Sequence, residues 1–378
     1  MQESTNQYDL VFEGGGAKGI VFVGAMQKFE SRGYTSRRLI GTSAGAITAT
    51  LLAARYTAEE LLDATMERTP NGKPRFSTFM DTPEAFSERA IENSFTFDVF
   101  RSIDIPLVPE WMEKRLDQRI FNQLMKLDIY REIFSFVERG GLYAGNKFLE
   151  WIREKLNAKG TNLGNATLSE FYQQNQKDLS VVASDTTAQE MLVLNHRTAP
   201  QCPVAWAVRM SMSIPFVWQE VLWKREWGTY QNQDLTGHTI VDGGALSNFP
   251  LDLVISRDKE VLDVMGNTDP DGADTLGLLI DESAEVPNSG ASADDDEESG
   301  LASHVQHLRV VRRIKRLVDT MMQARDKQVI EAYQDKVCRL PAKGYGTTEF
   351  DMSDARMEAL IEAGRNAIQK FFSQTPPV

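Results

Sequence analysis

Short apolar runs and amphipathic segments alternate along the N-terminal part of the chain. Residues 8–13 form an apolar run typical of a buried strand, and residues 20–33 carry apolar side chains at helical spacing. The same plan then repeats, with a short strand at Leu39 and Ile40, a tight turn, and a helix predicted to end near Tyr56. Two strand–turn–helix units in succession favour an α/β fold with a parallel sheet.

Later segments continue this alternation of strand and helix signals. The predicted strands are 179–187, 190–195, 238–250 and 275–282, and the first two are suited to a hairpin. Between them, residues 205–218 predict a helix that stops before Pro215. No change of composition precedes residue 283, so residues 1–282 are expected to form one domain.

The composition changes after residue 282. Residues 281–300 contain eight acidic residues and no basic ones, which is a large share of the net charge of −13. We expect residues 283–300 to form an acidic flexible linker or loop, because a segment so polar and charged buries little apolar surface. Residues 301–378 are expected to form helices that pack on the preceding domain.

The first helix predicted after the linker carries a basic face. Its basic residues include Arg309, Arg312, Arg313 and Arg316, which alternate with aliphatic side chains. A basic amphipathic helix can lie on an anionic membrane, and a surface helix packed on the protein shows the same pattern. These four arginines are therefore candidate membrane contacts. The aromatic segment 94–111 is similarly a candidate lid over an acyl chain or part of the ordinary core.

The overall composition argues against several classes of protein. A net charge of −13 argues against nucleic-acid binding. Two cysteines and four histidines leave little for a zinc site, and Cys202 and Cys338 are expected to be reduced, as in a cytoplasmic protein. No secretory signal and no apolar stretch of about 20 residues is recognisable, so we expect at most peripheral membrane contact.

The first turn is a glycine-rich loop with several possible ligands. Gly14, Gly16 and Gly19 match the spacing G-x-G-x-x-G of dinucleotide-binding loops. That function predicts an acidic residue about 20 positions later, where this chain has Arg37 and Arg38. The same backbone N–H groups are equally suited to an oxyanion hole, with Gly15 and Gly16 as donors. A phosphate-binding P-loop is excluded because Lys18 is followed by Gly19 and not by Ser or Thr.

The second turn, Gly41-Thr42-Ser43-Ala44-Gly45, matches G-x-S-x-G between an apolar strand and an apolar helix. In this motif a serine occupies a strained strand-to-helix turn, and small neighbours allow strand and helix to approach closely. The helix that follows also points its N-terminus at the serine, which favours negative charge there. Ser43 is therefore a candidate nucleophile.

The candidate base for this serine is a carboxylate. Asp242 ends a predicted strand, and Gly243 and Gly244 let the chain turn away beside it. An ordinary aspartate is a weak base, but burial raises its pKa towards a useful range. The chain has only four histidines, of which His304 and His307 follow the predicted linker, a poor platform for a positioned base.

Together, these residues resemble the patatin-like phospholipase family. That family combines a G-G-G-x-K/R-G loop, a G-x-S-x-G turn and a later D-G-G/A, and this chain has all three in the same order over roughly residues 8–255. The segment 207–218 also resembles the family's sequence ahead of the aspartate. The resemblance implies a three-layer α/β/α domain with a mostly parallel central sheet, to which the predicted C-terminal helices are added.

The resemblance also implies a function. It implies a hydrolase that cleaves fatty acyl esters of phospholipids or lysophospholipids, with Ser43 as nucleophile, Asp242 as general base and no metal or other cofactor. Gly15 and Gly16 would donate to the oxyanion, and Lys18 would fix the loop or meet a lipid headgroup. The other supporting positions are Gly14, Gly19, Gly41, Gly45, Gly243 and Gly244.

Three alternatives remain open from the sequence alone. A Ser–His–Asp esterase and an acyltransferase would use the same turn and loop. A non-catalytic α/β module could hold a nucleotide or a lipid headgroup at the glycine loop. The sequence indicates no particular activating protein and no oligomeric state.

Overall fold

A computed structural model describes residues 6–101, 120–160, 162–267, 272–287 and 329–374. Its centre is an eight-stranded sheet in the order β10-β9-β1-β2-β4-β8-β7, with β5 paired to β4. The strands are β1 Gln7–Phe12, β2 Thr35–Thr42, β4 Asp178–Asp185, β5 Glu190–Leu194, β7 Val221–Leu222, β8 Thr239–Asp242, β9 Asp274–Glu285 and β10 Val337–Lys343. The five strands from β10 to β4 run parallel, whereas β5, β8 and β7 pair in antiparallel fashion.

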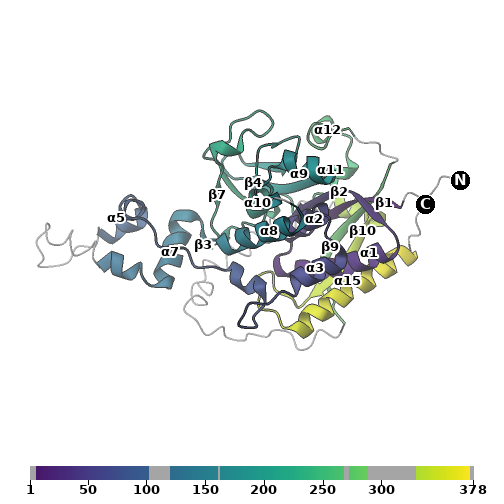
Figure 1. Ribbon diagram of the computed structural model, residues 1–378, viewed down its shortest axis with the longest axis horizontal. Coiled ribbons are helices and arrows are strands. Elements are labelled where there is room, and N and C mark those ends of the chain that lie inside the picture. The colour runs from purple at the N-terminus through teal and green to yellow at the C-terminus, as the bar shows by residue number, and fades with distance from the viewer. Residues whose placement is uncertain (1–5, 102–119, 161, 268–271, 288–328, 375–378) are drawn as a thin grey trace, which may run out of the picture.

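Helices cover both faces of this sheet (Figure 1). The helices of the main body are α1 Val21–Ser31, α2 Ala44–Ala53, α3 Ala58–Thr65, α8 Asn146–Lys159, α9 Leu168–Asn175, α10 Val204–Ser211, α11 Asp252–Ile255, α12 Lys259–Met265 and α15 Asp354–Gln374. In β1, Leu10 and Phe12 pack in the core cluster that includes α1, α2 and α15, while Val11 packs in a second cluster with α11 and α12. The fold is therefore a three-layer α/β/α arrangement.

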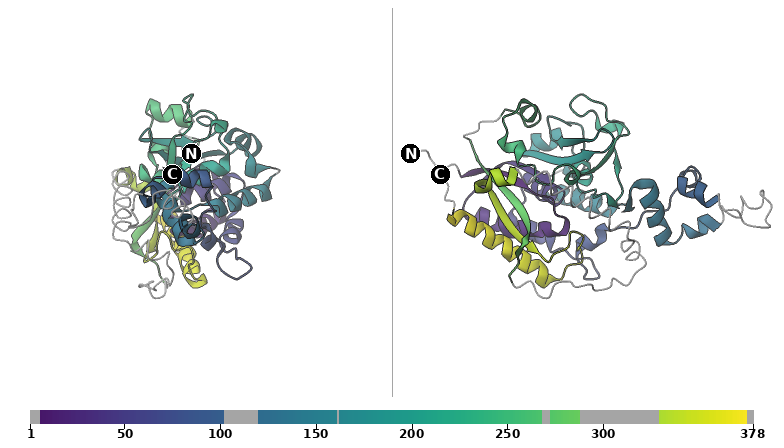
Figure 2. Two further views of the ribbon diagram at one scale, coloured as in Figure 1. Left: turned by 90° about the vertical axis from the view of Figure 1, so that its left-hand side faces the viewer. Right: turned by 180° about the vertical axis from the view of Figure 1, so that it is seen from behind.

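A helical extension, here called the arm, projects from the main body (Figures 1 and 2). It contains α4 Glu88–Glu92, α5 Phe95–Arg101 and α7 Asp128–Arg139, with a small core of its own around Phe97, Phe121 and Phe134. At its base, β3 Gly141–Tyr143 pairs with β6 Phe216–Trp218. Residues 94–101 of the candidate lid at 94–111 lie in the arm, and residues 102–111 lie outside the described part.

The elements predicted for the first 60 residues are confirmed. β1, β2 and their helices appear in order, although α2 ends at Ala53 rather than near Tyr56, and a 3-10 turn, η1 Gly16–Ile20, precedes α1. The predicted hairpin of 179–187 and 190–195 is the antiparallel pair β4–β5. The helix predicted over 205–218 ends at Ser211, four residues before Pro215.

The C-terminal region differs from its prediction in two respects. β9 continues to Glu285, into the segment expected to be a linker, and residues 288–300 are not described. Residues 337–343 form β10, an edge strand of the central sheet, so this region is not purely helical. α15 packs on α1, as the prediction of a C-terminal helix on the domain requires.

The predicted basic helix with Arg309, Arg312, Arg313 and Arg316 lies outside the described residues. Cys202 and Cys338 are both free and buried. Among the described helices, none is long and apolar enough to cross a membrane.

Candidate active site

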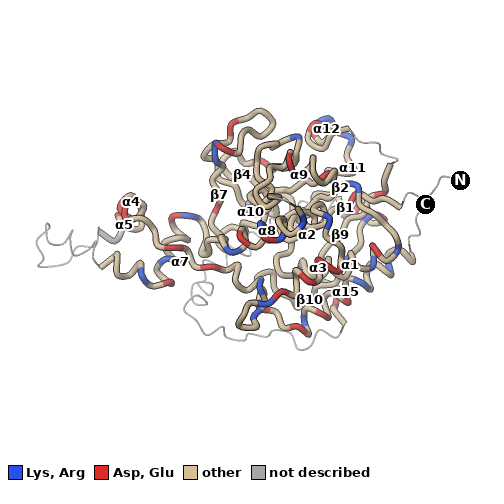
Figure 3. Tube along the Cα trace, viewed as in Figure 1, with Lys and Arg blue, Asp and Glu red and all other residues tan. Residues whose placement is uncertain are grey.

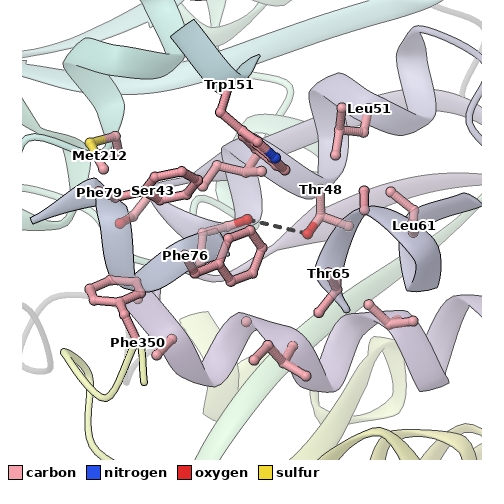
Figure 4. A pocket seen from close by; sticks show the side chains of 18 of the residues that line it. Ser43, Thr48, Leu51, Leu61, Thr65, Phe76, Phe79, Trp151, Met212 and Phe350 are labelled. Atoms are coloured by element: carbon pink, nitrogen blue, oxygen red, sulfur yellow. Dashed lines mark hydrogen bonds between the residues drawn. The ribbon is translucent and has the colours of Figure 1, made fainter. Parts of the chain in front are cut away.

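Ser43 occupies the sharp turn between β2 and α2. Its backbone has φ 52° and ψ −120°, a left-handed conformation that costs free energy for any residue other than glycine. The turn is so tight that a Cβ on Gly41 would lie 2.3 Å from the Gly45 carbonyl carbon, and one on Gly45 would lie 2.3 Å from the Phe12 oxygen. Both glycines of G-x-S-x-G are therefore required by close approach, and they leave Ser43 at the edge of a pocket (Figure 4).

Asp242 ends β8 and is almost completely buried, with 1% of its surface exposed. Its Oδ1 accepts a hydrogen bond from the Gly244 N–H at 2.8 Å, and its own N–H donates to the Ser213 carbonyl at 2.9 Å. Within the described residues, its Oδ2 has no partner with hydrogen-bond geometry. One carboxylate oxygen is thus held by the backbone and the other is available for chemistry.

Burial raises the pKa of the Asp242 carboxyl to about 7. The nearby Ser43 hydroxyl and the Gly244 N–H act in the opposite direction, because both favour the charged carboxylate. The Ser43 hydroxyl is thus close enough to affect Asp242 without forming a well-aligned hydrogen bond to Oδ2, which is common before substrate binds. A carboxyl with a pKa near 7 is suited to act as a general base near neutral pH.

The sheet topology explains why Ser43 and Asp242 meet. β5 pairs with one edge of β4 over residues 181–185, so β2 and β8 must share the opposite edge. Along that edge Thr42 is paired with Val182, and Asp242 is paired with the next residue, Ala183. β2 and β8 run towards each other and both leave the sheet there. The residues at their C-terminal ends are thereby brought together.

The two glycines after Asp242 shape this junction. A Cβ on Gly243 would lie 2.4 Å from the Val182 carbonyl oxygen, so the turn after β8 has no room for a side chain there. The Gly243 carbonyl also accepts a hydrogen bond from the Ser184 hydroxyl at 3.2 Å. Gly244 contributes its N–H to Asp242, as described above. Both predicted glycines therefore support the carboxylate.

The glycine-rich loop lies directly over the Ser43 turn. A Cβ on Gly14 would be 3.2 Å from the Ser43 Cβ, and one on Gly19 would be 2.6 Å from the Ala44 Cβ. The N–H groups of Gly15 and Gly16 make no hydrogen bond within the described part of the chain. Only Gly16 of these two lines the pocket with Ser43. The loop thus has two unused backbone donors beside the serine.

Lys18 is buried and is not among the residues that line the pocket. Only 3% of the residue is exposed, and its ammonium group pairs with the carboxylate of Glu282 on β9. The resemblance implied that Lys18 either fixes the glycine loop or meets a lipid headgroup. An ion pair with β9 favours the first of these roles. A headgroup contact would require the ion pair between the buried Lys18 and the exposed Glu282 to open.

The pocket that begins at Ser43 is almost entirely apolar. It contains about 730 Å³ of empty space including its open mouth. Its walls come from α1, α2, α3, α8 and the segments around them, as Figure 4 shows. Among the polar lining residues, the Thr48 hydroxyl donates a hydrogen bond to the Ala44 carbonyl at 3.2 Å. Such a cavity is suited to a hydrocarbon chain and provides no cluster of charges for a phosphate.

The pocket follows one side of α2 for about 12 Å, from Ser43 to Leu51 at 1.5 Å per residue. Leu61, Ala64 and Thr65 of α3 also line it, and Leu61 and Thr65 lie on the side away from Ser43 (Figure 4). An ester carbonyl at Ser43 would therefore have its acyl chain along α2, with the chain end against α3.

Three polar residues that sequence reasoning did not identify support the junction. The Ser211 hydroxyl accepts the Ser43 N–H at 2.9 Å and donates to the Val182 carbonyl at 2.5 Å. The guanidinium of Arg209 is buried and bonds the hydroxyl of Ser213, whose carbonyl holds Asp242. All three lie in the segment 207–218 that resembled the family, which was the available signal.

The described histidines are not placed to act with Ser43. His238 Nδ1 contacts Asp185 Oδ2 at 2.7 Å, and His238 precedes Asp242 by four residues, roughly 13 Å along an extended strand. His196 stacks on the Tyr172 ring at 3.7 Å. Neither histidine lines the pocket. His304 and His307 are not among the described residues.

Comparisons with known proteins agree with this architecture. The sequence model of patatin-like phospholipases matches residues 10–255. Similar curated proteins are the uncharacterized protein YqhO of Bacillus subtilis (strain 168), 28% identical with 97% of this chain and 98% of that protein covered, and the uncharacterized protein R571 of Acanthamoeba polyphaga mimivirus, 25% identical with 65% and 60% covered.

Two solved structures are distant neighbours. VipD from Legionella pneumophila has a TM-score of 0.47 at 17% identity, with 97% of this chain and 67% of that chain covered. The type III effector protein ExoU has a TM-score of 0.38 at 15% identity, and this chain spans about half of its length, 53%. Since the family match covers most of the chain and contains the glycine loop, the serine turn and the aspartate, this protein belongs to the patatin-like phospholipase family.

Proposed function

We propose that the protein is a serine acyl hydrolase of phospholipase A or lysophospholipase type that works through a Ser43–Asp242 dyad. The observation that carries this proposal is the buried Asp242 carboxylate, with one oxygen unengaged among the described residues, next to a strained serine at an apolar pocket. This combination supplies a nucleophile, a base of suitable pKa and a site for an acyl chain.

The reaction would proceed in two steps. In the first, Asp242 Oδ2 takes the hydroxyl proton as Ser43 Oγ attacks the ester carbonyl, and the carbonyl oxygen becomes an oxyanion. The bond to the leaving alcohol then breaks and Asp242 returns the proton to that alcohol, which leaves an acyl-serine. In the second step, Asp242 takes a proton from water, the hydroxide attacks the acyl-serine, and the proton returns to Ser43 as the fatty acid departs.

The oxyanion formed in both steps would accept hydrogen bonds from Gly15 and Gly16. Their N–H groups have no other partner in the described part of the chain and lie in the loop that covers Ser43. Donors fixed before the reaction stabilise charge that develops only in the transition state, which makes this contribution large. Gly16 is the better supported donor because it also lines the pocket.

Lipid-mass profiling tests this function. Wild type and Ser43→Ala would be incubated with vesicles of mixed phospholipids and lysophospholipids, and free fatty acids and lyso products would be quantified. We expect fatty-acid release by the wild type and none above background by the variant. A catalytically active Ser43→Ala protein, or products only when an acceptor alcohol is added, would contradict hydrolysis by this serine and favour another nucleophile or acyl transfer.

A binding module without turnover is the alternative from another class. The pocket at the glycine loop is apolar, and Lys18 is occupied by Glu282, so the site offers little for a nucleotide phosphate. A serine-reactive fluorophosphonate probe separates the two functions. Labelling that depends on Ser43 supports the enzyme, and the absence of labelling in a protein that binds lipid supports the module.

We also propose that the arm contacts the lipid surface from which the substrate comes. Of the nine exposed large apolar side chains among the described residues, seven belong to the arm. They are Phe95, Val99, Ile120, Leu127, Tyr130, Ile133 and Val137. Both signs of charge alternate along the arm, so the contact would rest on insertion of apolar side chains rather than on anionic headgroups (Figure 3).

The arm is also continuous with the active-site region. The Phe136 ring of α7 packs 5.8 Å from the Phe216 ring, and Trp218 at the end of the same strand lines the pocket. We expect the double variant Tyr130→Ser and Val137→Ser to bind neutral phosphatidylcholine vesicles several-fold more weakly, with little salt dependence. Leu222→Ser, at an exposed leucine outside the arm, is the matched control. Equal binding by both proteins, or a protein dimer that hides the arm, would overturn the proposal.

A further inference from the structure

A loop from the C-terminal part of the chain lies against the glycine-rich loop. Residues 344–352, here called the strap, connect β10 to α15. They lie well beyond residue 255, where the match to the family model ends. The Thr347 carbonyl in the strap accepts a hydrogen bond from the Ala17 N–H at 2.9 Å. Residues outside the family region therefore contact the backbone that is proposed to stabilise the oxyanion.

We propose that the strap is a positioning element of the active site, which holds the glycine loop so that Gly15 and Gly16 present their N–H groups to the oxyanion. The inference rests on the proposed hydrolase function for its catalytic consequence. The strap itself does not touch the reacting atoms.

The contact between strap and loop is tight at Gly16. A Cβ on Gly16 would lie 2.1 Å from the Thr347 carbonyl oxygen, and the glycine has φ 56°. The strap thus leaves no space for a side chain, and the backbone conformation disfavours one as well. Glycine is therefore required at position 16 for both steric and backbone reasons, and the Thr347 carbonyl fixes the loop at the next residue, Ala17.

The other N–H groups of the loop show how the positioning works. The Gly14 N–H donates to the Asn248 carbonyl at 3.0 Å, the Ala17 N–H donates to Thr347, and the Lys18 N–H donates to the Gly15 carbonyl at 3.2 Å. Each flank of the loop is tied to a different segment of the protein. Gly15 and Gly16 lie between these hydrogen-bonded residues, and their N–H groups have no partner among the described residues.

The strap is itself held in shape by Arg356 at the start of α15. The Arg356 guanidinium donates to both oxygens of Glu349, at 2.7 and 3.1 Å, and to the Gly344 carbonyl at 2.8 Å. Its charge also lies 4.1 Å from the centre of the Tyr345 ring, and Glu349 accepts the Gly346 N–H at 2.9 Å. A bidentate arginine–carboxylate pair fixes geometry as well as charge, so Arg356 fastens the strap.

The strap also forms part of the pocket wall. Phe350 lines the pocket and packs edge-on against Trp218, with ring centres 5.6 Å apart. One short segment therefore contacts both the glycine loop and the space proposed for the acyl chain. Loosening it should affect the chemical step through the loop and, to a smaller extent, acyl-chain binding through Phe350.

The test replaces Arg356 by Met, which keeps the length of the side chain and removes its hydrogen bonds. We expect kcat for ester hydrolysis to fall by about tenfold while KM changes less than about threefold, because a loosened oxyanion donor weakens transition-state stabilisation more than substrate binding. We also expect faster hydrogen–deuterium exchange at the Ala17 N–H in Arg356→Met. Arg356→Lys keeps the charge but lacks the planar pair of donors. Its kcat and its Ala17 exchange rate should lie between those of Arg356→Met and wild type.

Arg365→Met is the matched control for a general effect on α15. Arg365 lies on the same helix and bonds Gln27 of α1 at 2.6 Å, far from the strap. If Arg365→Met lowers kcat and accelerates Ala17 exchange as much as Arg356→Met does, the strap has no specific role and the inference is overturned. Unchanged exchange at Ala17 in Arg356→Met overturns it as well.

The two readouts also separate this inference from the proposed function. Exchange at Ala17 reports on the strap whether or not the protein is an enzyme. A wild type without Ser43-dependent hydrolysis would remove the proposed function, while faster exchange in Arg356→Met alone would still support the strap as the element that holds the loop. Unchanged exchange in an active enzyme would overturn the strap and leave the dyad intact.

Discussion

The two strand–turn–helix units at the N-terminus share one plan and differ in what their turns supply. The turn after β1 is made of glycines, enters α1 through the 3-10 turn η1, and leaves two backbone N–H groups without partners in the described region. The turn after β2 is a single strained residue, Ser43, that leads straight into α2. The first unit presents backbone donors and the second presents a side chain.

The difference lies in where each turn is constrained. Gly16 is confined by a carbonyl from the strap, so a glycine is needed at the donor position itself. Around Ser43 the glycines stand at either side, at Gly41 and Gly45, and let the strand and helix close on the serine. A turn that must expose its backbone needs glycine within it, and a turn that must expose a side chain needs glycine around it.

Ser43→Ala should have the largest effect, because it removes the nucleophile. We expect kcat/KM for a water-soluble fatty acyl ester to fall by about 10³-fold or more, with the protein still folded. Activity would be measured together with circular dichroism to confirm the fold. A residual rate within tenfold of the wild type would mean that the second turn does not supply the reacting group.

Asp242→Asn should lower activity nearly as much, because it removes the general base, and it should raise the stability of the protein. Because burial raises the Asp242 pKa to about 7, the folded protein holds this proton more tightly than the unfolded chain, whose pKa is about 3.9. Stability therefore falls as pH rises from about 4 to 7, and Asn removes this contribution. We expect Asp242→Asn to raise Tm relative to wild type at pH 8 and to raise it less at pH 5. An equal difference at both pH values would contradict a buried, titrating carboxylate.

The pH profile of the wild type offers a related test. A general base must be deprotonated, so kcat/KM should rise with pH and reach half of its plateau near the Asp242 pKa of about 7. His238→Ala should leave this profile unchanged, since His238 is paired with Asp185 away from the pocket. Loss of the rising limb in His238→Ala would favour a histidine base instead.

Gly16→Ala should lower kcat by about 10²-fold, because the new Cβ would displace the loop that carries the oxyanion donors. Gly33→Ala is the control for the positive φ alone, since Gly33 has φ 77° and no heavy atom within 4 Å of the added Cβ. Steady-state kinetics of both variants separates steric displacement from backbone strain. Similar losses in both variants would contradict a specific role of the first turn.

The smallest expected effect concerns the strain at Ser43. Glycine adopts the Ser43 conformation at little cost, whereas alanine does not, so Ser43→Gly should be more stable than Ser43→Ala by about 1 kcal/mol. Urea denaturation of the two inactive variants measures this difference. Equal stability would indicate that the turn is not strained.

The sequence predicted the local structure around Ser43 and Asp242 well. The G-x-S-x-G turn at Ser43 and the carboxylate before Gly243 are local signals, because the required residues are neighbours along the chain. The predicted strands around them were also correct, with β1, β2, β4, β5, β8 and β9 close to their expected places. These predictions depended on short periodic patterns and on turn residues.

Long-range features could not be predicted in this way. The meeting of Ser43 and Asp242 depends on β8 pairing with β4 in line with β2, which no local pattern specifies. β10 was missed because Pro341 lies within it, and proline is tolerated there since β10 is an edge strand. The strap was missed for a different reason, because Thr347 acts through a backbone carbonyl that carries no sequence signal.

We propose Ser43 as the nucleophile and Asp242 as its base. The most direct test of this proposal is the rate of fluorophosphonate labelling at pH 8, followed by intact mass and peptide mapping for wild type, Asp242→Asn and His238→Ala. We expect a single adduct on Ser43, formed at the wild-type rate in His238→Ala and at least about 10²-fold more slowly in Asp242→Asn. An adduct on another residue, or labelling of Asp242→Asn at the wild-type rate, would contradict the proposal.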